Sequence, residues 1–358
     1  MADVASRNGK RRAPEPVSEA PASGSTALVS LSKPVPQEGL VVAVAHGFFE
    51  VVSAESIFLC TLRGRLRKPR LSPPRKQPGG SSGQVAVEDI PLRIAPGDRV
   101  QFTPLGAGQG IIEDVLPRRS FLSRARSQSG GEQVMLANLD QAVLVFAVRE
   151  PMPHFGMLDR YLALCEHAGV EVSICLNKVD LGVPVEVGSE ARLYQELGYR
   201  TIFTSATTRE GIGTLQGQLR GRTSLLTGPS GVGKSSLMNI CMPDANQRTA
   251  DISDATGKGR HTTTGVRLLP LDEGGWLADS AGIRELALWN VPSEALAQTF
   301  VELRSAAGEC LFENCDHSEG EGGCALREVL ERGAITPNRF ASFMRLLAEA
   351  RESETPRW

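Results

Sequence analysis

The chain has 358 residues, of which 41% are hydrophobic and 22% charged, and its formal net charge is −2. This composition can bury proper cores, so a wholly disordered chain is excluded. At about 150 residues per domain, the length predicts two or three domains. No apolar run approaches the roughly 20 residues that span a bilayer, so we expect a soluble, cytoplasmic protein with no membrane partner.

Residues 1–37 are rich in Pro, Ser and Ala and contain no apolar stretch of the signal-peptide type. They are predicted to form a disordered tail. An organelle transit peptide is a weaker alternative, because such peptides avoid the acidic residues that this segment contains.

Charge is unevenly distributed along the chain. Residues 38–126 hold 13 Lys and Arg against 8 Asp and Glu, whereas residues 127–358 hold 21 against 30. A basic module on an acidic body indicates that one region meets a polyanion. A solvated basic surface without a partner is the alternative.

Short apolar segments separated by Gly- and Pro-rich turns follow the tail, and none shows a helical period. Many short strands within about 80 residues are typical of a small β-barrel. The predicted strands are 39–45, 48–53, 56–62, 85–90, 99–103 and 110–115.

From residue 138 the pattern changes to strands that alternate with helices. Residues 142–148 form a continuous apolar run, which is typical of a buried parallel strand. An amphipathic helix containing Leu158 and Cys165 follows, and the alternation predicts a parallel α/β sheet. Further strands are predicted at 170–176, 201–204, 223–227 and 276–278. Beyond Pro292 the strands end, and helices are predicted at 293–305 and 339–351.

Residues 228–235 fit the pattern G-x-x-x-x-G-K-[ST] between a predicted strand and a predicted helix, which is the context that this pattern requires. Glycines let the backbone aim its N–H groups at phosphates, and the helix N-terminus adds a positive dipole end. Lys234 is expected to reach the β- and γ-phosphates, and Ser235 to bind Mg²⁺. The predicted phosphate-binding residues are Gly228, Pro229, Ser230, Gly231, Val232, Gly233, Lys234, Ser235 and Ser236.

The sequence N-K-V-D at residues 177–180 directly follows a predicted strand and resembles the guanine-reading motif of GTPases. The Asp180 carboxylate can accept two N–H bonds from guanine, and adenine offers no such pair. The S-A pair that ends the next strand resembles the loop whose backbone N–H contacts guanine O6. By itself the four-residue match is weak, and a plain loop is the alternative. The predicted guanine-binding residues are Asn177, Lys178, Val179, Asp180, Ser205 and Ala206.

Asp279 and Gly282 fit the pattern D-x-x-G after another predicted strand. In GTPases this Asp holds Mg²⁺ through water, and the N–H of the Gly meets the γ-phosphate. The polar segment 257–264 lies between this motif and the phosphate loop. It is a candidate switch loop, in which one of three consecutive threonines, assigned as Thr263, closes on Mg²⁺.

All five GTPase elements are therefore present, but the guanine-reading pair precedes the phosphate loop. Function depends on which strand ends lie together in space, and not on chain order. A circular permutation keeps the site and moves the termini, and it is tolerated because domain termini often lie close together.

This order, with a small barrel before and Cys/His-bearing helices after, resembles the RsgA (YjeQ) family of circularly permuted GTPases over roughly residues 38–351. The segment G-R-H-T-T-T at 259–264 and Asn138-Leu139-Asp140 are its most specific pieces. The resemblance implies a monomeric GTP hydrolase that binds the small (30S) ribosomal subunit and its rRNA, assists late maturation and is stimulated by the ribosome. The implied domains are an OB-fold barrel at 38–122, a permuted Ras-like domain at 123–290 and a zinc-bearing helical domain at 291–358.

Three cysteines and one histidine cluster near the C-terminus, at Cys310, Cys315, His317 and Cys324. Three thiolates and one imidazole suit a closed tetrahedral structural zinc site, and in an intracellular chain this spacing favours metal over a disulfide. The family usually has five residues before the last Cys, whereas six stand here in a flexible loop. Reduced cysteines around a helix end are the alternative.

The predicted barrel carries no acidic residue from Thr61 to Lys76 but seven basic ones, which favours RNA contact through phosphates. Few aromatic residues accompany them, so we expect the protein to recognise the shape and phosphates of RNA and not to stack on its bases.

Ile283 stands where Ras-like enzymes have the Gln that orients the attacking water, so intrinsic turnover is expected to be slow. The resemblance points instead to His261 as the water-positioning residue, with Lys234 countering charge on the γ-phosphate. A solvent-exposed switch histidine is an equal alternative. Two other functions stay open: an RNA-binding scaffold that holds nucleotide without useful hydrolysis, and an ATP-using P-loop enzyme.

Overall fold

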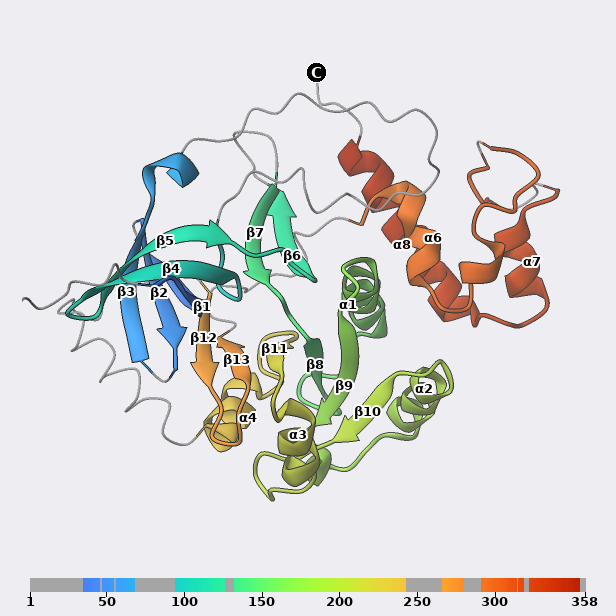
Figure 1. The fold of residues 1–358 in the computed structure, drawn as a ribbon. Coiled ribbons are helices and arrows are strands. Elements are labelled where there is room, and N and C mark those ends of the chain that lie inside the picture. The colour runs from blue at the N-terminus through green and yellow to red at the C-terminus, as the bar shows by residue number, and fades with distance from the viewer. Residues whose placement is uncertain are drawn as a thin grey trace, which may run out of the picture. The chain divides into compact units, whose positions relative to one another are not determined.

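The computed structural model describes residues 35–45, 47–54, 56–67, 94–125, 132–242, 266–279, 291–313, 315–318 and 322–354 (Figure 1). Several sequence predictions lie outside these residues: the tail up to residue 34, the strand at 85–90, the basic stretch from Lys68 onward and the switch loop at 257–264. Within the described ranges, no helix combines the length and the apolar character needed to cross a bilayer.

Five strands in the first third of the chain close into a barrel. Their order is β1-β2-β3-β5-β4, and β4 pairs back onto β1. Alternate side chains, among them Val41, Val51 and Phe102, point inward and form a separate core. The predicted OB-type barrel is therefore confirmed. The strands are β1 (Gln37–Ala45), β2 (Phe48–Ser53), β3 (Ser56–Leu62), β4 (Arg99–Gly106) and β5 (Gln109–Val115), and a 3-10 turn, Gly64–Arg67, follows β3.

A second group of strands forms the predicted parallel sheet, in the order β10-β9-β8-β11-β13, with β12 antiparallel to β13. The central strand β8 is buried along its whole length, as expected for a sheet covered on both faces. The strands are β8 (Gln141–Ala147), β9 (Glu171–Asn177), β10 (Arg200–Phe203), β11 (Thr223–Thr227), β12 (Arg267–Pro270) and β13 (Trp276–Asp279).

Helices cover the two faces of this sheet. Leu144 of β8 shares one core with α1 and α2, whereas the next residue, Val145, shares the opposite core with α3 and α4. Successive side chains of the strand point to opposite faces of the sheet, so β8 contributes to both hydrophobic layers. The helices are α1 (Phe155–His167), α2 (Val185–Glu196), α3 (Ile212–Leu219) and α4 (Lys234–Cys241), and a 3-10 turn, Val179–Leu181, follows β9.

The sequence did not identify the hairpin of β6 (Phe121–Ala125) and β7 (Glu132–Ala137), nor β12, which pairs with β1 of the barrel. Barrel and parallel sheet therefore belong to one 11-stranded sheet. The predicted domain boundary between residues 122 and 123 falls inside β6, and the domain limits stay a prediction.

No strand follows Pro292 in the part of the chain that the structure describes, as predicted, and α7 (Ala325–Glu331) and α8 (Pro337–Glu354) are long enough to pack as helices. The prediction of one helix over 293–305 is wrong. A 3-10 turn (Ser293–Ala295), a short α6 (Leu296–Thr299) and a second 3-10 turn (Arg304–Ala306) replace it. The backbone becomes extended at Phe300, which is 1% exposed, so burial of this ring overrides helical continuity.

Candidate nucleotide site and metal centre

The predicted nucleotide motifs all follow strands that run in the same direction through neighbouring positions of one sheet. β9 ends at Asn177, β10 at Phe203, β11 at Thr227 and β13 at Asp279. Ligands of open α/β sheets bind outside the carboxyl ends of the strands. The fold therefore brings to one edge the loops that chain order separates.

The guanine-reading motif and the phosphate loop are in direct contact. The amide Nδ2 of Asn177, whose side chain is buried, donates a hydrogen bond of 2.8 Å to the carbonyl oxygen of Val232. The other end of the same amide accepts a hydrogen bond of 3.1 Å from the hydroxyl of Thr204. Asn177 therefore connects the phosphate loop to the loop that follows β10. Thr204 lies in the predicted segment 204–206, but no role was predicted for its hydroxyl, because only its place beside β9 in the sheet indicates one.

Asp180 is held by the loop after β10. The hydroxyl of Ser205 donates a 2.5 Å hydrogen bond to one carboxylate oxygen of Asp180, and the same hydroxyl accepts from the backbone N–H groups of Thr207 and Thr208. The backbone N–H of Val179 also donates to the carbonyl of Thr204. These bonds orient the Asp180 carboxylate and leave its second oxygen for other partners. The half-buried Ala206 lies in the same loop.

Lys178 follows Asn177 in the left-handed region, with φ of +65°. Its ammonium donates to the backbone carbonyl of Glu150, in the loop that follows β8. Across the same gap, Arg149 Nε donates a 3.0 Å hydrogen bond to the carbonyl of Gly182. The loop after β8 and the guanine-reading loop are therefore joined at two points.

Close approaches explain two glycines of the phosphate loop. A Cβ on Gly228 would lie 2.0 Å from the carbonyl oxygen of Val145 in β8, and one on Gly233 would lie 2.3 Å from Asn177 Nδ2. Both residues also have positive φ, +148° and +93°, which L side chains rarely adopt. The remaining loop residues Pro229, Ser230 and Gly231 surround the turn, and Ser235 and Ser236 are exposed in the first turn of α4.

Lys234 folds back over the loop. Its Nζ donates hydrogen bonds of 2.7 Å and 2.6 Å to the carbonyls of Gly228 and Pro229. Partial burial lowers the pKa of this lysine below its usual value. The ammonium is therefore held by neutral carbonyls, which a phosphate could replace with a stronger, charge-assisted partner.

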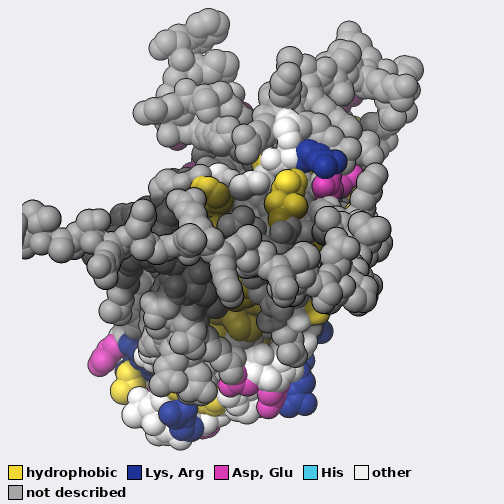
Figure 2. Space-filling model, turned by 60° about the vertical axis from the view of Figure 1, so that its left-hand side comes forward, with side chains coloured by type: hydrophobic (Ala, Val, Ile, Leu, Met, Phe, Trp, Pro, Cys, Tyr) yellow, Lys and Arg dark blue, Asp and Glu magenta, His cyan; other side chains and the backbone are white. Residues whose placement is uncertain are grey.

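Four predicted site elements are not described. His261, Thr263 and Gly282 lie outside the described residues, and of Asp279 only the backbone at the end of β13 is described. The predicted basic surface is described in part. Arg63 of the predicted stretch 61–76 pairs with Glu113 at 2.9 Å. On the face seen in Figure 2, the described basic and acidic side chains are interspersed rather than segregated.

The structure brings together all four predicted metal ligands. One ligand atom from each of Cys310, Cys315, His317 and Cys324 lies within 4.8 Å of the others. His317 Nδ1 is 3.6, 3.4 and 3.4 Å from the sulfurs of Cys310, Cys315 and Cys324, and the Cys310 and Cys324 sulfurs are 4.0 Å apart. Tetrahedral zinc bonds would place such S···N and S···S pairs about 3.6 Å and 3.8 Å apart. The cluster fits a metal ion of that size.

Backbone contacts shape this cluster. Cys324 immediately precedes α7 as its N-cap, and His317 has φ of +63°. The N–H of Leu311 donates to the carbonyl of Gly323 at 2.9 Å, so the two ends of the ligand loop are tied together. This arrangement holds three sulfurs around one imidazole nitrogen and leaves no fifth protein ligand among the described residues.

Comparison with known proteins gives consistent matches. A family model described as RsgA GTPase matches residues 115–289. A "Small ribosomal subunit biogenesis GTPase RsgA" from Moorella thermoacetica is 38% identical over 87% of this chain and 97% of its own length. A protein with the same description from Gemmatimonas aurantiaca is 39% identical over 87% and 96%.

Two solved structures also match most of the chain. The crystal structure of YjeQ from Thermotoga maritima is 30% identical, with a TM-score of 0.65, over 88% of this chain and 99% of that one. The structure of YloQ, described as a circularly permuted GTPase, is 25% identical, with a TM-score of 0.65, over 90% and 98%.

Proposed function

The chain belongs to the RsgA family of circularly permuted GTPases, and from this premise we propose that it binds GTP and GDP and assists late maturation of the small ribosomal subunit. The single observation that supports nucleotide binding most strongly is the Asn177–Val232 hydrogen bond. It joins the loop suited to guanine with the loop suited to phosphates, at the edge of the sheet where such ligands bind.

Guanine would be read by residues 177–180 together with Ser205 and Ala206. Asp180 would accept the N1 and N2 hydrogens of guanine with its two carboxylate oxygens, one of which also accepts from Ser205. Adenine lacks that donor pair, so it would leave the Asp180 carboxylate without partners on the base. The stem of Lys178 would lie along the base, since its ammonium is anchored at Glu150.

The phosphates would occupy the loop 228–236. Lys234 would exchange two carbonyls for the β- and γ-phosphates and counter the charge that develops during transfer. Mg²⁺, when bound with GTP, would supply further charge neutralisation, and Ser235, Thr263 and Asp279 would hold it. Gly282 would contact the γ-phosphate through its N–H, and His261 would orient the attacking water.

The metal centre is proposed to hold one structural zinc ion. The donor set of Cys310, Cys315, His317 and Cys324 supports this assignment, because three thiolates and an imidazole suit zinc and leave no open position for catalysis. Binding of the ion would contribute directly to folding of the C-terminal region.

The cycle that we propose is a population shift. GTP orders the switch segment and favours docking on the small subunit, contact with rRNA accelerates hydrolysis, and the GDP state releases. The relatives are described as small ribosomal subunit biogenesis GTPases, and this is what supports the partner. We expect the protein to act as a cytoplasmic monomer.

Nucleotide competition tests the site. GDP should displace a fluorescent GDP analogue at far lower concentration than ADP, and Asp180→Asn should weaken GDP because the carboxylate acceptor is lost. Equal displacement by ADP would identify an ATP-using enzyme and refute the guanine assignment.

Phosphate release, measured with and without purified small subunits, tests the activity. Stimulation by subunits is the expected result, and His261→Ala should reduce the stimulated rate. Equal rates with and without subunits would refute the coupling, and no release in either condition would identify a nucleotide-holding scaffold.

A further inference from the structure

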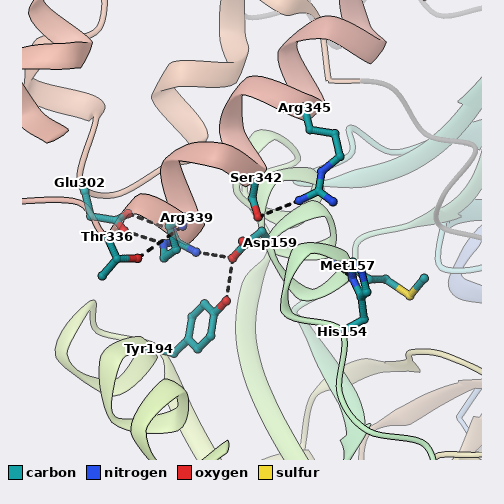
Figure 3. Close-up of polar contacts among 9 residues, drawn as sticks. All are labelled: His154, Met157, Asp159, Tyr194, Glu302, Thr336, Arg339, Ser342 and Arg345. Carbon is teal, nitrogen blue, oxygen red and sulfur yellow. Dashed lines mark hydrogen bonds and ion pairs between the residues drawn. The ribbon is translucent and has the colours of Figure 1, made fainter. Parts of the chain in front are cut away.

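A buried ionic network joins the C-terminal region to the parallel-sheet domain (Figure 3). Arg339 of α8 is 2% exposed, and its Nη1 donates a 2.5 Å hydrogen bond to Asp159 of α1. Its Nε and Nη2 donate to the two carboxylate oxygens of Glu302, at 2.5 Å and 2.8 Å. Tyr194 of α2 donates its hydroxyl to the same Asp159 oxygen at 2.7 Å. One guanidinium therefore holds together residues from both regions.

The network contains two carboxylates and one cation, all nearly excluded from water. Burial raises the pKa of Asp159, and this effect is opposed by Arg339 and by hydrogen bonds from Ser342 and Tyr194. The guanidinium also lies over two rings, with its carbon 5.3 Å from the centroid of Tyr194 and 5.0 Å from that of Phe300. These charge-assisted hydrogen bonds require particular distances and directions between the helices, whereas an apolar contact would tolerate more variation. We call this group of residues the Arg339 joint.

The two helices in this joint lead directly into the guanine-reading loops. α1 begins at Phe155, just after the loop in which Glu150 holds Lys178. α2 begins at Val185, five positions after Asp180 in the chain. A second bond, from Arg149 to the carbonyl of Gly182, connects the two loops closer to the start of α2. The angle between α1 and α2 therefore sets how the loop after β8 and the guanine-reading loop face each other.

We infer that Arg339 is a positioning residue that couples the packing of α8 against α1 and α2 to guanine recognition. It fixes Asp159 and Tyr194, and through them the relative placement of α1 and α2 that holds residues 177–180 in their binding geometry. A partner that moves α8 would change affinity for the base more than affinity for the phosphates, because the phosphate loop follows β11 and meets the guanine-reading loop through the Asn177–Val232 bond. This inference rests on the proposed function of the site.

Titration calorimetry with GDP and, separately, with pyrophosphate tests the coupling in the full-length protein. Arg339→Met removes the cation but keeps an apolar stem. It should weaken GDP by about 5- to 150-fold, the usual range of coupling between sites, and weaken pyrophosphate much less. Arg332→Met is the matched control, because it makes the same change at an exposed residue of the C-terminal region, at the end of α7, that is not part of this network. It should change neither affinity.

Tyr194→Phe gives a milder test should Arg339→Met fail to fold. It removes one hydroxyl donor to Asp159 and should weaken GDP about twofold to tenfold, as expected for a single hydrogen bond, again with a smaller effect on pyrophosphate. By reciprocity, GDP should slow amide exchange in α8 of the unmodified protein, and this protection should shrink in the variant.

Unchanged GDP affinity in these variants would overturn the coupling, and so would an equal loss for GDP and pyrophosphate, which a general loosening of the fold would give. Failure of the unmodified protein to bind GDP would instead refute the proposed function itself. The two failures are thus told apart by the unmodified protein.

Discussion

A methyl group at position 233 would collide with the hydrogen bond that joins the two halves of the candidate nucleotide site. The new Cβ would lie 2.3 Å from Asn177 Nδ2, far inside the roughly 3.5–4.0 Å at which carbon contacts are favourable. Either the Asn177 amide or the phosphate loop must move, and in both cases the bond to the Val232 carbonyl is lost.

The size of the effect follows from two contributions. An L side chain in the left-handed region costs about 1–2 kcal/mol, and φ at Gly233 is +93°. A buried carbonyl that loses its donor costs about 1–3 kcal/mol. Together these give about 2–5 kcal/mol. If the phosphate loop must recover its present form to bind, even the lower value weakens GDP by about 30-fold.

Binding of a fluorescent GDP analogue to Gly233→Ala, alongside thermal unfolding, measures this loss. Gly217→Ala is the matched control, since a Cβ there meets nothing within 4 Å inside α3. It should bind normally and be more stable by about 0.5–1 kcal/mol. Gly233→Ala with normal GDP affinity would show that the Asn177–Val232 contact is irrelevant to binding.

Ser205→Ala should weaken GDP about fivefold in a competition assay, because the neighbouring carboxylate loses the donor that orients it. Cys324→Ser should lower bound zinc per chain in elemental analysis and lower the melting temperature, since one of four ligands is lost. Burial lowers the pKa of Lys234, so its ammonium loses its proton at a lower pH than an exposed lysine does. GDP affinity, measured in the same competition assay, should fall as pH rises through that pKa. Over the same pH range the folded state stops paying the cost of a buried cation, so this contribution to the free energy of unfolding should rise. Arg118→Met should cost about 3–5 kcal/mol in urea unfolding, because Asp98, 0% exposed, would lose its bidentate partner.

Much of the site was predictable because its signals are local. The phosphate loop, the guanine-reading motif and the metal ligands each occupy a short stretch with a fixed spacing. Their convergence followed from the rule that parallel strands share a carboxyl edge. The barrel and the buried strands were predictable for a related reason, since period-two and continuous apolar patterns depend on few neighbours.

The joint at Arg339 was not predictable from local pattern. Asp159 and Arg339 are 180 positions apart, and each is a charged residue on a helix, which ordinarily indicates a solvated surface. The helix that we predicted at 293–305 is also absent because of contacts between residues that are distant in the chain. Phe300 is fixed by rings that arrive later in the chain, among them Phe343 at 5.5 Å between centroids. Tertiary burial decided both features.

The pairing of β12 with β1 determines where this protein can be cut. Ala43 is bonded to Arg267 across the two strands, and the side chain of Arg267 also reaches Glu50. A fragment that starts after the barrel would remove this neighbour and expose the edge of β12 that faces away from β13. Exposed strand edges of that kind attract other chains, so such a fragment is expected to aggregate or dimerise, and its kinetics would describe an artefact of truncation.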